Sequence, residues 1–113
     1  MFKRGFGEIS MPVVIDIFGY KIYFWSNEGK PLEPIHVHVS KKPSKNATKI
    51  WLLSTGKIKL ANNNSNISKQ DLKRILWVIE SYHKDIKREW ILRFKQIKYY
   101  DTFYKNSNNA HSL

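Results

Sequence analysis

Two histidines stand one residue apart in the stretch IHVHVS, which covers residues 35–40. In a β-strand, side chains two residues apart lie on the same face, so His36 and His38 are expected side by side. Histidine changes its charge near neutral pH and also ligates metals. The pair is therefore a candidate for packing, for metal ligation, or for proton transfer between a base and an acid.

The neighbours of the two histidines favour an exposed pair. Val37 and Val39 alternate with them and are expected to face the core. Both imidazoles then face solvent or a shallow cleft, which argues against a purely structural role. A metal site would need a third and usually a fourth ligand. The candidates are His83, Glu28 and Glu33, and since nothing else supports such a site we expect no metal and no other cofactor.

Proton transfer would suit the cleavage of RNA by its own 2′-hydroxyl, which needs a base, an acid and a cation near the phosphate. His36 and His38 supply the first two as catalytic residues, and Lys41 or Lys42 in the basic loop that follows supplies the cation. The sequence thus permits a metal-independent RNase. The alternative, in which the pair lines a non-catalytic interaction surface, stays open, and so does the question whether the protein is an enzyme.

The composition supports a polyanionic partner. The chain of 113 residues carries 20 Lys and Arg against 9 Asp and Glu, a net charge of +11. Such an excess attracts nucleic acid or acidic proteins. A lysine-rich proteome is the alternative explanation. No cysteine is present, no apolar run is long enough to span a membrane, and no signal peptide is recognisable, so we expect a cytoplasmic protein.

The pattern of apolar residues predicts an α+β fold: a small antiparallel sheet of four or five strands packed on one long C-terminal helix, with a kink near 83–85 as the alternative. Ser68 is the expected N-cap of that helix. We expect strands over 11–18, 20–26, 35–40, 48–54 and 57–61, and a helix over 68–98. The predicted division is an N-terminal extension (1–10), a single domain (11–100) and a flexible tail (101–113).

An exposed tryptophan among lysines marks the helix surface. Trp77 projects away from the apolar stripe, and such a residue can contact a base, a phosphate backbone or a partner protein. The alternative is that it covers a strand end or a self-association contact. The residues expected to bind nucleic acid or a partner are Lys41, Lys42, Lys45, Lys73, Trp77, Lys84, Arg88 and Lys95.

Several short motifs occur in a known order over about residues 11–95. They are Met11 and Pro12, Ser26 to Gly29, His36 to Val39, Lys49 to Leu52, and Trp90. This ordered set resembles the bacterial domain-of-unknown-function 4160 family. The resemblance implies a small α+β protein encoded beside another small protein, in the manner of toxin–antitoxin pairs. Ile35 departs from the proline that often precedes the first histidine of the family.

Together these features predict a toxin–antitoxin component that engages RNA or an acidic protein partner such as a cognate antitoxin. The enzymatic form of this hypothesis is the RNase described above. The alternative is a non-enzymatic inhibitor or adaptor, phage- or plasmid-borne, that binds a protein or nucleoprotein complex through its basic face. We expect no membrane partner, and a homodimer stays open.

Overall fold

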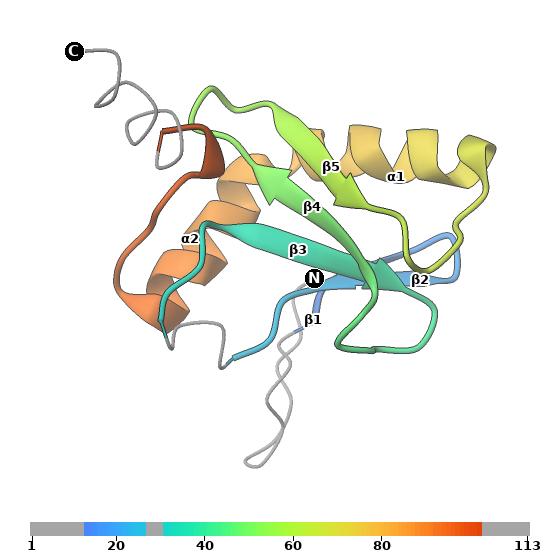
Figure 1. Cartoon of the computed structure of the whole chain (residues 1–113), viewed down its shortest axis with the longest axis horizontal. Helices are drawn as coiled ribbons and strands as arrows, with labels where there is room; N and C mark the ends of the chain where they lie inside the picture. Colours follow the sequence, from blue (N-terminus) through green and yellow to red (C-terminus); the bar gives the residue numbers. More distant parts are fainter. Residues whose placement is uncertain (1–12, 27–30, 103–113) are drawn as a thin grey trace.

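The computed structural model describes residues 13–26 and 31–102 of the chain. The predicted N-terminal extension (1–10) lies outside the described residues, and so does the predicted tail (101–113) beyond Thr102. Within the described part, the chain forms a sheet followed by two helices, which lie on one side of the sheet (Figure 1). The predicted α+β class is confirmed.

The sheet is a five-stranded antiparallel meander, because each strand pairs with the next one along the chain. The predicted strands are confirmed, although their ends differ: the second strand stops at Tyr23 rather than at residue 26, and the fifth ends at Asn62 rather than at residue 61. The strands are β1 (Val13–Ile17), β2 (Tyr20–Tyr23), β3 (His36–Ser40), β4 (Thr48–Leu52) and β5 (Ile58–Asn62).

The strand register divides the sheet into two faces. On one face, Ile22 lies opposite Val39 and Val37 lies opposite Ile50, and all four side chains are buried in the core. We call this the helix face, because the hydroxyl of Tyr20, two residues before Ile22, bonds to Asp71 of the first helix. The other face, the histidine face, carries Tyr23, His36, His38, Lys49 and Trp51.

Two helices, α1 (Lys69–Ser81) and α2 (His83–Phe94), replace the single long helix that the sequence predicts. The prediction of one continuous helix is wrong. The alternative, a kink near residues 83–85, lies one residue after the observed break at Tyr82. The predicted N-cap is confirmed, since the Ser68 hydroxyl accepts a hydrogen bond from the Asp71 N–H at 3.2 Å. This bond satisfies one of the free N–H groups at the start of α1.

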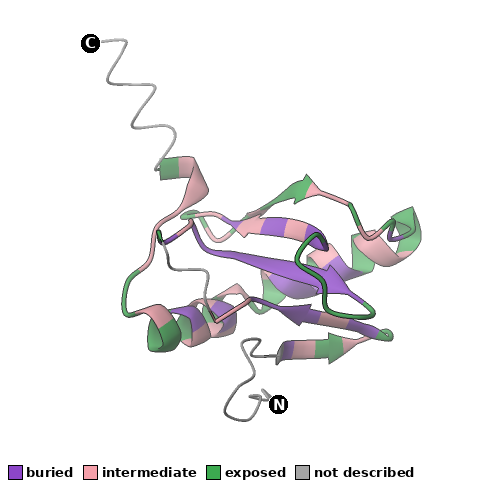
Figure 2. Ribbon diagram, turned by 60° about the horizontal axis from the view of Figure 1, so that its bottom comes forward, coloured by how far each residue is buried: buried purple, intermediate pink, exposed green. Residues whose placement is uncertain are grey.

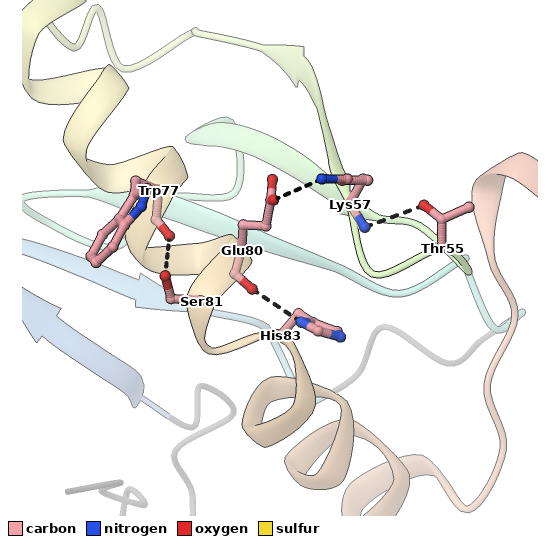
Figure 3. A network of polar contacts seen from close by, with 6 residues as sticks. All are labelled: Thr55, Lys57, Trp77, Glu80, Ser81 and His83. Atoms are coloured by element: carbon pink, nitrogen blue, oxygen red, sulfur yellow. Dashed lines mark hydrogen bonds and ion pairs between the residues drawn. The ribbon is translucent and has the colours of Figure 1, made fainter.

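The break falls where side chains bind the last carbonyl groups of α1. Ser81 Oγ donates to the Trp77 carbonyl at 2.8 Å, and His83 Nδ1 donates to the Glu80 carbonyl at 3.0 Å (Figure 3). Tyr82 itself has φ −103° and ψ 16°, outside the helical region. Ser, Tyr and His are weaker helix formers than Ala or Leu, so a break needs neither Gly nor Pro here.

The core lies between the helix face and the two helices. Ile75 and Ile79 of α1 and Ile86 and Trp90 of α2 are fully buried in the same cluster as the apolar residues of the strands. The exposed sides of both helices alternate with these buried positions (Figure 2). Since burial of one large apolar side chain stabilises a fold by about 1.5–3 kcal/mol, this layer holds the helices on the sheet.

The turn between β1 and β2 is strained. It consists of Phe18 and Gly19, and both have positive φ, at 53° and 78°. Two-residue hairpin turns of this kind favour Asn or Asp followed by Gly. A bulky residue such as Phe at positive φ is unusual, and it costs about 1–2 kcal/mol relative to ordinary backbone.

None of the helices in the described part of the chain has the length and apolar character that crossing a bilayer requires.

The turn between β4 and β5 yields a test of how α2 begins. Gly56 has φ +88°, and a Cβ there would lie 3.2 Å from His83 Nε2, whereas a Cβ at Gly19 would meet nothing within 4 Å. Gly56→Ala should destabilise the fold by about 1–2 kcal/mol from backbone strain, plus a contribution from the His83 contact. Urea denaturation should show a larger loss than for Gly19→Ala.

A double variant isolates that contact. In the His83→Ala background the extra cost of Gly56→Ala over Gly19→Ala should vanish, because the ring that the Cβ meets is gone. If Gly56→Ala and Gly19→Ala lower the free energy of unfolding equally in the wild-type background, the contact of residue 56 with His83 adds nothing to the cost of the substitution.

Candidate functional site

Both histidines of the pair are buried, which corrects the expectation that they face solvent or a shallow cleft. The relative exposure of His36 is 0% and that of His38 is 6%. The alternation itself is confirmed, since Val37 and Val39 lie on the helix face and the histidines on the other. However, β3 is the middle strand and is buried along its whole length (Figure 2).

Aromatic rings surround the two imidazoles. The ring centroids of His36 and His38 are 5.0 Å apart, with the rings nearly perpendicular. Trp51 and Trp90 lie edge-on to His36, at 5.6 Å and 5.5 Å, and the Tyr23 ring lies 5.7 Å from His38. His36 Nδ1 is 2.9 Å from the Pro34 carbonyl oxygen. Because a carbonyl only accepts, this nitrogen carries a proton and the ring is held in one orientation.

Trp90 reaches His36 because β2 ends early. The pairing of β2 with β3 runs only as far as Tyr23 and His38, so β2 does not continue beside His36. Trp90 of α2 packs there and also lies 5.0 Å from the Phe24 ring. The indole thus closes the end of the sheet where a strand would otherwise lie, and this packing explains the complete burial of His36.

Those candidate metal ligands that the structure describes, His83 and Glu33, do not join the histidine pair. Among residues 13–26 and 31–102 there is no group of three or more His, Cys, Asp or Glu side chains placed to hold a metal ion. Glu33 instead accepts a hydrogen bond from Lys49 Nζ at 2.8 Å. His83 lies on α2 against the turn at Gly56, and Glu28 lies outside the described residues.

The basic loop after β3 is held by one buried hydroxyl. Tyr23 Oη accepts a hydrogen bond from the Ser44 N–H at 2.9 Å and lies 2.9 Å from Ser40 Oγ. These bonds fix the loop whose exposed lysines are the predicted binding residues Lys41, Lys42 and Lys45. The loop is therefore ordered on the sheet, although its charges face solvent.

Lys41 extends from this loop toward β2. Its Nζ lies 5.5 Å from the centroid of the Tyr20 ring, a cation–π contact. Burial raises the pKa of the Tyr20 hydroxyl, and the neighbouring Asp71 carboxylate, which accepts its hydrogen bond, raises it further. Tyr20 therefore stays protonated at neutral pH and links β2 to α1.

A groove beside Trp77 is a candidate binding feature that is open to solvent. Its volume is about 840 Å³, and it lies between the β1–β2 turn and α1. Trp77 is 71% exposed and Phe18 is 51% exposed, and the Arg74 guanidinium lies 5.7 Å from the centroid of the Phe18 ring. The side chains that line the groove are Ile17, Phe18, Gln70, Lys73, Arg74, Trp77 and Val78. Among the residues that the structure describes, its lining combines two exposed aromatic rings with two cations and no carboxylate.

A second hollow of about 530 Å³ shares Ile17 and Val78 with this groove and extends it along β1. It contains Arg88, which pairs with Asp85 at 3.4 Å. The structure thus brings together Lys73 and Trp77, with Arg88 in the extension. The other predicted binding residues, Lys41, Lys42, Lys45, Lys84 and Lys95, are exposed but line neither hollow.

Two groove residues were missed from sequence. Arg74 lies on α1 one residue after Lys73, and Phe18 belongs to a stretch that reads as the end of a buried strand. A signal for Phe18 was present, because the Phe-Gly pair separates two predicted strands and must therefore form their turn. A hydrophobic residue in such a turn cannot enter the sheet and is left exposed.

These observations define a small α+β domain with a five-stranded antiparallel meander, two helices on one face, and an aromatic and basic groove at the first hairpin. Comparison of the chain with family models gives a match to the domain of unknown function DUF4160 over residues 19–91. The chain belongs to the DUF4160 family. No curated protein and no solved structure matches it.

The role of Tyr23 can be tested by removing only its hydroxyl. Tyr23→Phe should lower the free energy of unfolding by about 1–3 kcal/mol, because the buried partners Ser40 and Ser44 lose a hydrogen bond. Hydrogen exchange should also become faster at the amides of loop 41–46. The matched control Tyr82→Phe, at an exposed position, should change stability by less than about 0.5 kcal/mol. If both variants behave alike, Tyr23 does not hold the loop.

Proposed function

We propose that this protein is a non-enzymatic binding module, and that the groove beside Trp77 takes an acidic segment of a partner protein. The single observation that carries the proposal is the exposed Trp77 indole in a groove that also contains Phe18, Lys73 and Arg74. Exposed Trp and Arg are the residue types that most often dominate protein–protein binding energy. In the toxin–antitoxin pairing that the family resemblance leads us to expect, the partner is a cognate acidic protein.

The chemistry of the groove favours a protein segment over nucleic acid. Its lining is largely apolar and includes Ile17 and Val78, with cations at Lys73 and Arg74. An apolar or aromatic side chain of the partner would fill the hollow, and flanking Asp or Glu would meet the two cations. The net charge of +11 would steer an acidic partner toward the protein from a distance.

Backbone strain at Phe18 supports the same interpretation. A Phe at φ 53° is kept at a turn position where Asn would fit without strain. Strained residues persist where the side chain serves a purpose that outweighs the loss of stability. Here the strain accompanies an aromatic ring in the lining of the groove, next to Arg74.

The RNase hypothesis finds less support, because general acid–base catalysis requires contact between the imidazoles and the substrate. With His36 and His38 buried among aromatic rings, a phosphate cannot reach either ring without opening the fold. Incubation with RNA in EDTA tests it. Cleavage by the wild type that is lost in a folded His36→Ala/His38→Ala variant would establish the enzyme instead.

Peptide selection tests the binding module directly. Phage-displayed random peptides selected on the wild-type protein should be enriched in Asp and Glu around an apolar or aromatic residue. For a selected peptide, Trp77→Ala should weaken binding by about 2 kcal/mol, or roughly thirtyfold, in isothermal titration calorimetry. Arg74→Glu should also weaken binding of the peptide, and by more than the matched change Lys84→Glu, because Lys84 lies outside the groove.

A second exposed apolar residue supplies the control. Leu92→Ala, at an exposed position of α2 that lines neither hollow, should leave the affinity unchanged. Loss of binding in Leu92→Ala but not in Trp77→Ala would move the site elsewhere. Failure to enrich acidic peptides, together with binding of an oligonucleotide that depends on Trp77, would assign the groove to nucleic acid.

Phe18→Asn should separate stability from binding. Asn adopts positive φ more readily than Phe, so the variant should be more stable by about 0.5–1 kcal/mol in urea denaturation. It should also bind the selected acidic peptide more weakly, because the aromatic wall of the groove is gone. A variant that is stabilised and still binds with full affinity would show that Phe18 has no part in recognition.

A further inference from the structure

Trp51 on the histidine face is covered by a tyrosine in a parallel stack. Its ring and that of Tyr100 have centroids 4.9 Å apart and planes that differ by 15°. By contrast, the neighbouring His36 ring meets Trp51 edge-on, at 79°. A parallel, offset arrangement is also the geometry in which a nucleobase stacks on an aromatic side chain. Tyr100 therefore occupies the place that a base would take on Trp51.

Two lysines flank this stack. Lys49 Nζ lies 4.3 Å from the centroid of Trp51, and Lys59 Nζ lies 5.9 Å from that of Tyr100. Both lysines belong to the histidine face, since Lys49 precedes Trp51 by two residues in β4 and Lys59 of β5 lies opposite Trp51. Lys49 also pairs with Glu33, for which a phosphate could substitute. Aromatic rings beside cations are the common plan of surfaces that bind single-stranded nucleic acid.

The segment that carries Tyr100 is docked on the end of the sheet and is not part of it. This segment, residues 95–102, follows α2 and passes the ends of β3 and β4 (Figure 1). It begins at Lys95, whose left-handed conformation (φ 64°) ends the helix, and the Lys98 carbonyl then accepts the Ile35 N–H at 2.9 Å. Next to Tyr100, the Asp101 carboxylate accepts hydrogen bonds from Ser54 Oγ at 2.6 Å and from Ser54 N–H at 3.0 Å.

The anchor at Asp101 lies at the surface. Burial by itself raises the pKa of its carboxyl, but the hydrogen bonds from Ser54 and from nearby backbone N–H groups together outweigh this and lower it. The anchor is therefore ionised and intact at neutral pH, and it is lost only as the pH falls through this lowered pKa. Exposed hydrogen bonds contribute modestly to stability, so the Asp101 anchor opposes displacement of Tyr100 from Trp51 only weakly, and the backbone bond at Lys98 need not break.

We infer that Trp51 is a stacking site for one base of a single-stranded nucleic acid, and that Tyr100 holds the place of the base in the unliganded protein. Lys49 and Lys59 bind the phosphates on either side of that base. The site lies on the histidine face, whereas the groove beside Trp77 lies between the first hairpin and α1, so the two sites involve different residues. This inference does not depend on the proposed partner-binding function.

Fluorescence anisotropy with labelled oligouridine and oligothymidine of about ten nucleotides tests the site at one fixed salt concentration. Tyr100→Ala removes the competing ring and should tighten binding about fivefold or more, whereas Trp51→Leu should weaken it about tenfold. The double variant should bind as weakly as Trp51→Leu, because both substitutions act on one platform. Equal affinity for the two probes would show that neither the 2′-hydroxyl nor the thymine methyl group is recognised, and a preference for oligouridine that persists against oligodeoxyuridine would identify RNA.

Controls separate stacking from folding. Trp51→Phe keeps an aromatic ring and should retain most of the binding, while thermal unfolding verifies that each variant is folded. The matched control Tyr82→Ala, at an exposed tyrosine between the helices, should bind like the wild type. The inference is overturned if Tyr100→Ala binds no better than the wild type, or if a folded Trp51→Leu protein binds the probes with full affinity.

Discussion

The structure depends on the burial of β3 on both faces. β3 is the middle of five strands: β4 covers one edge, and β2 covers the other as far as His38, with Trp90 beside His36. The helices cover its valines, and a layer of rings covers its histidines. Buried imidazoles need polar partners, and the Pro34 carbonyl provides one by bonding His36 Nδ1. The centre of the sheet is thereby closed to a substrate. The two sites proposed above accordingly lie away from the middle of β3, at the first hairpin and on β4.

The break at Tyr82 determines which helical residues reach the core and which remain outside. Because α2 starts anew after Tyr82, its apolar side need not continue the line of α1. Trp90 can therefore pack at the end of the sheet against Phe24 and His36. Trp77, one turn before the break, points away from the polar contacts between Lys57 and Glu80 (Figure 3) and lines the groove with the first hairpin.

The two proposed sites have the same arrangement of side chains. Each sets an aromatic ring beside cations: Phe18 beside Arg74 in the groove, and Trp51 beside Lys49 on the histidine face. The groove contains backbone strain at Phe18, whereas the proposed stacking site at Trp51 is covered by the ring of Tyr100. Local departures of this kind from the most stable arrangement are where function is expected in an otherwise consistent fold.

Much of the fold was determined by the sequence alone. The period-two alternation predicted the strands, Ser68 predicted the start of α1, and the ordered motifs pointed to the family that the comparison then established. These features are local, since alternation and capping depend on residues close together in the chain. For the same reason the sequence correctly predicted that His36 and His38 share a face and that Trp77 lies off the apolar stripe of the helix.

Only the tertiary structure decided whether the face of β3 that carries the histidines is exposed to solvent or buried. The alternation of β3 separates two sides but does not say that Trp51, Trp90 and Tyr23 will cover the side that carries the histidines. Likewise the pairing of Phe18 with Arg74, and of Trp51 with Tyr100, joins residues about fifty positions apart in the chain. Burial depends on such long-range contacts, and a periodic pattern contains no information about what packs against it.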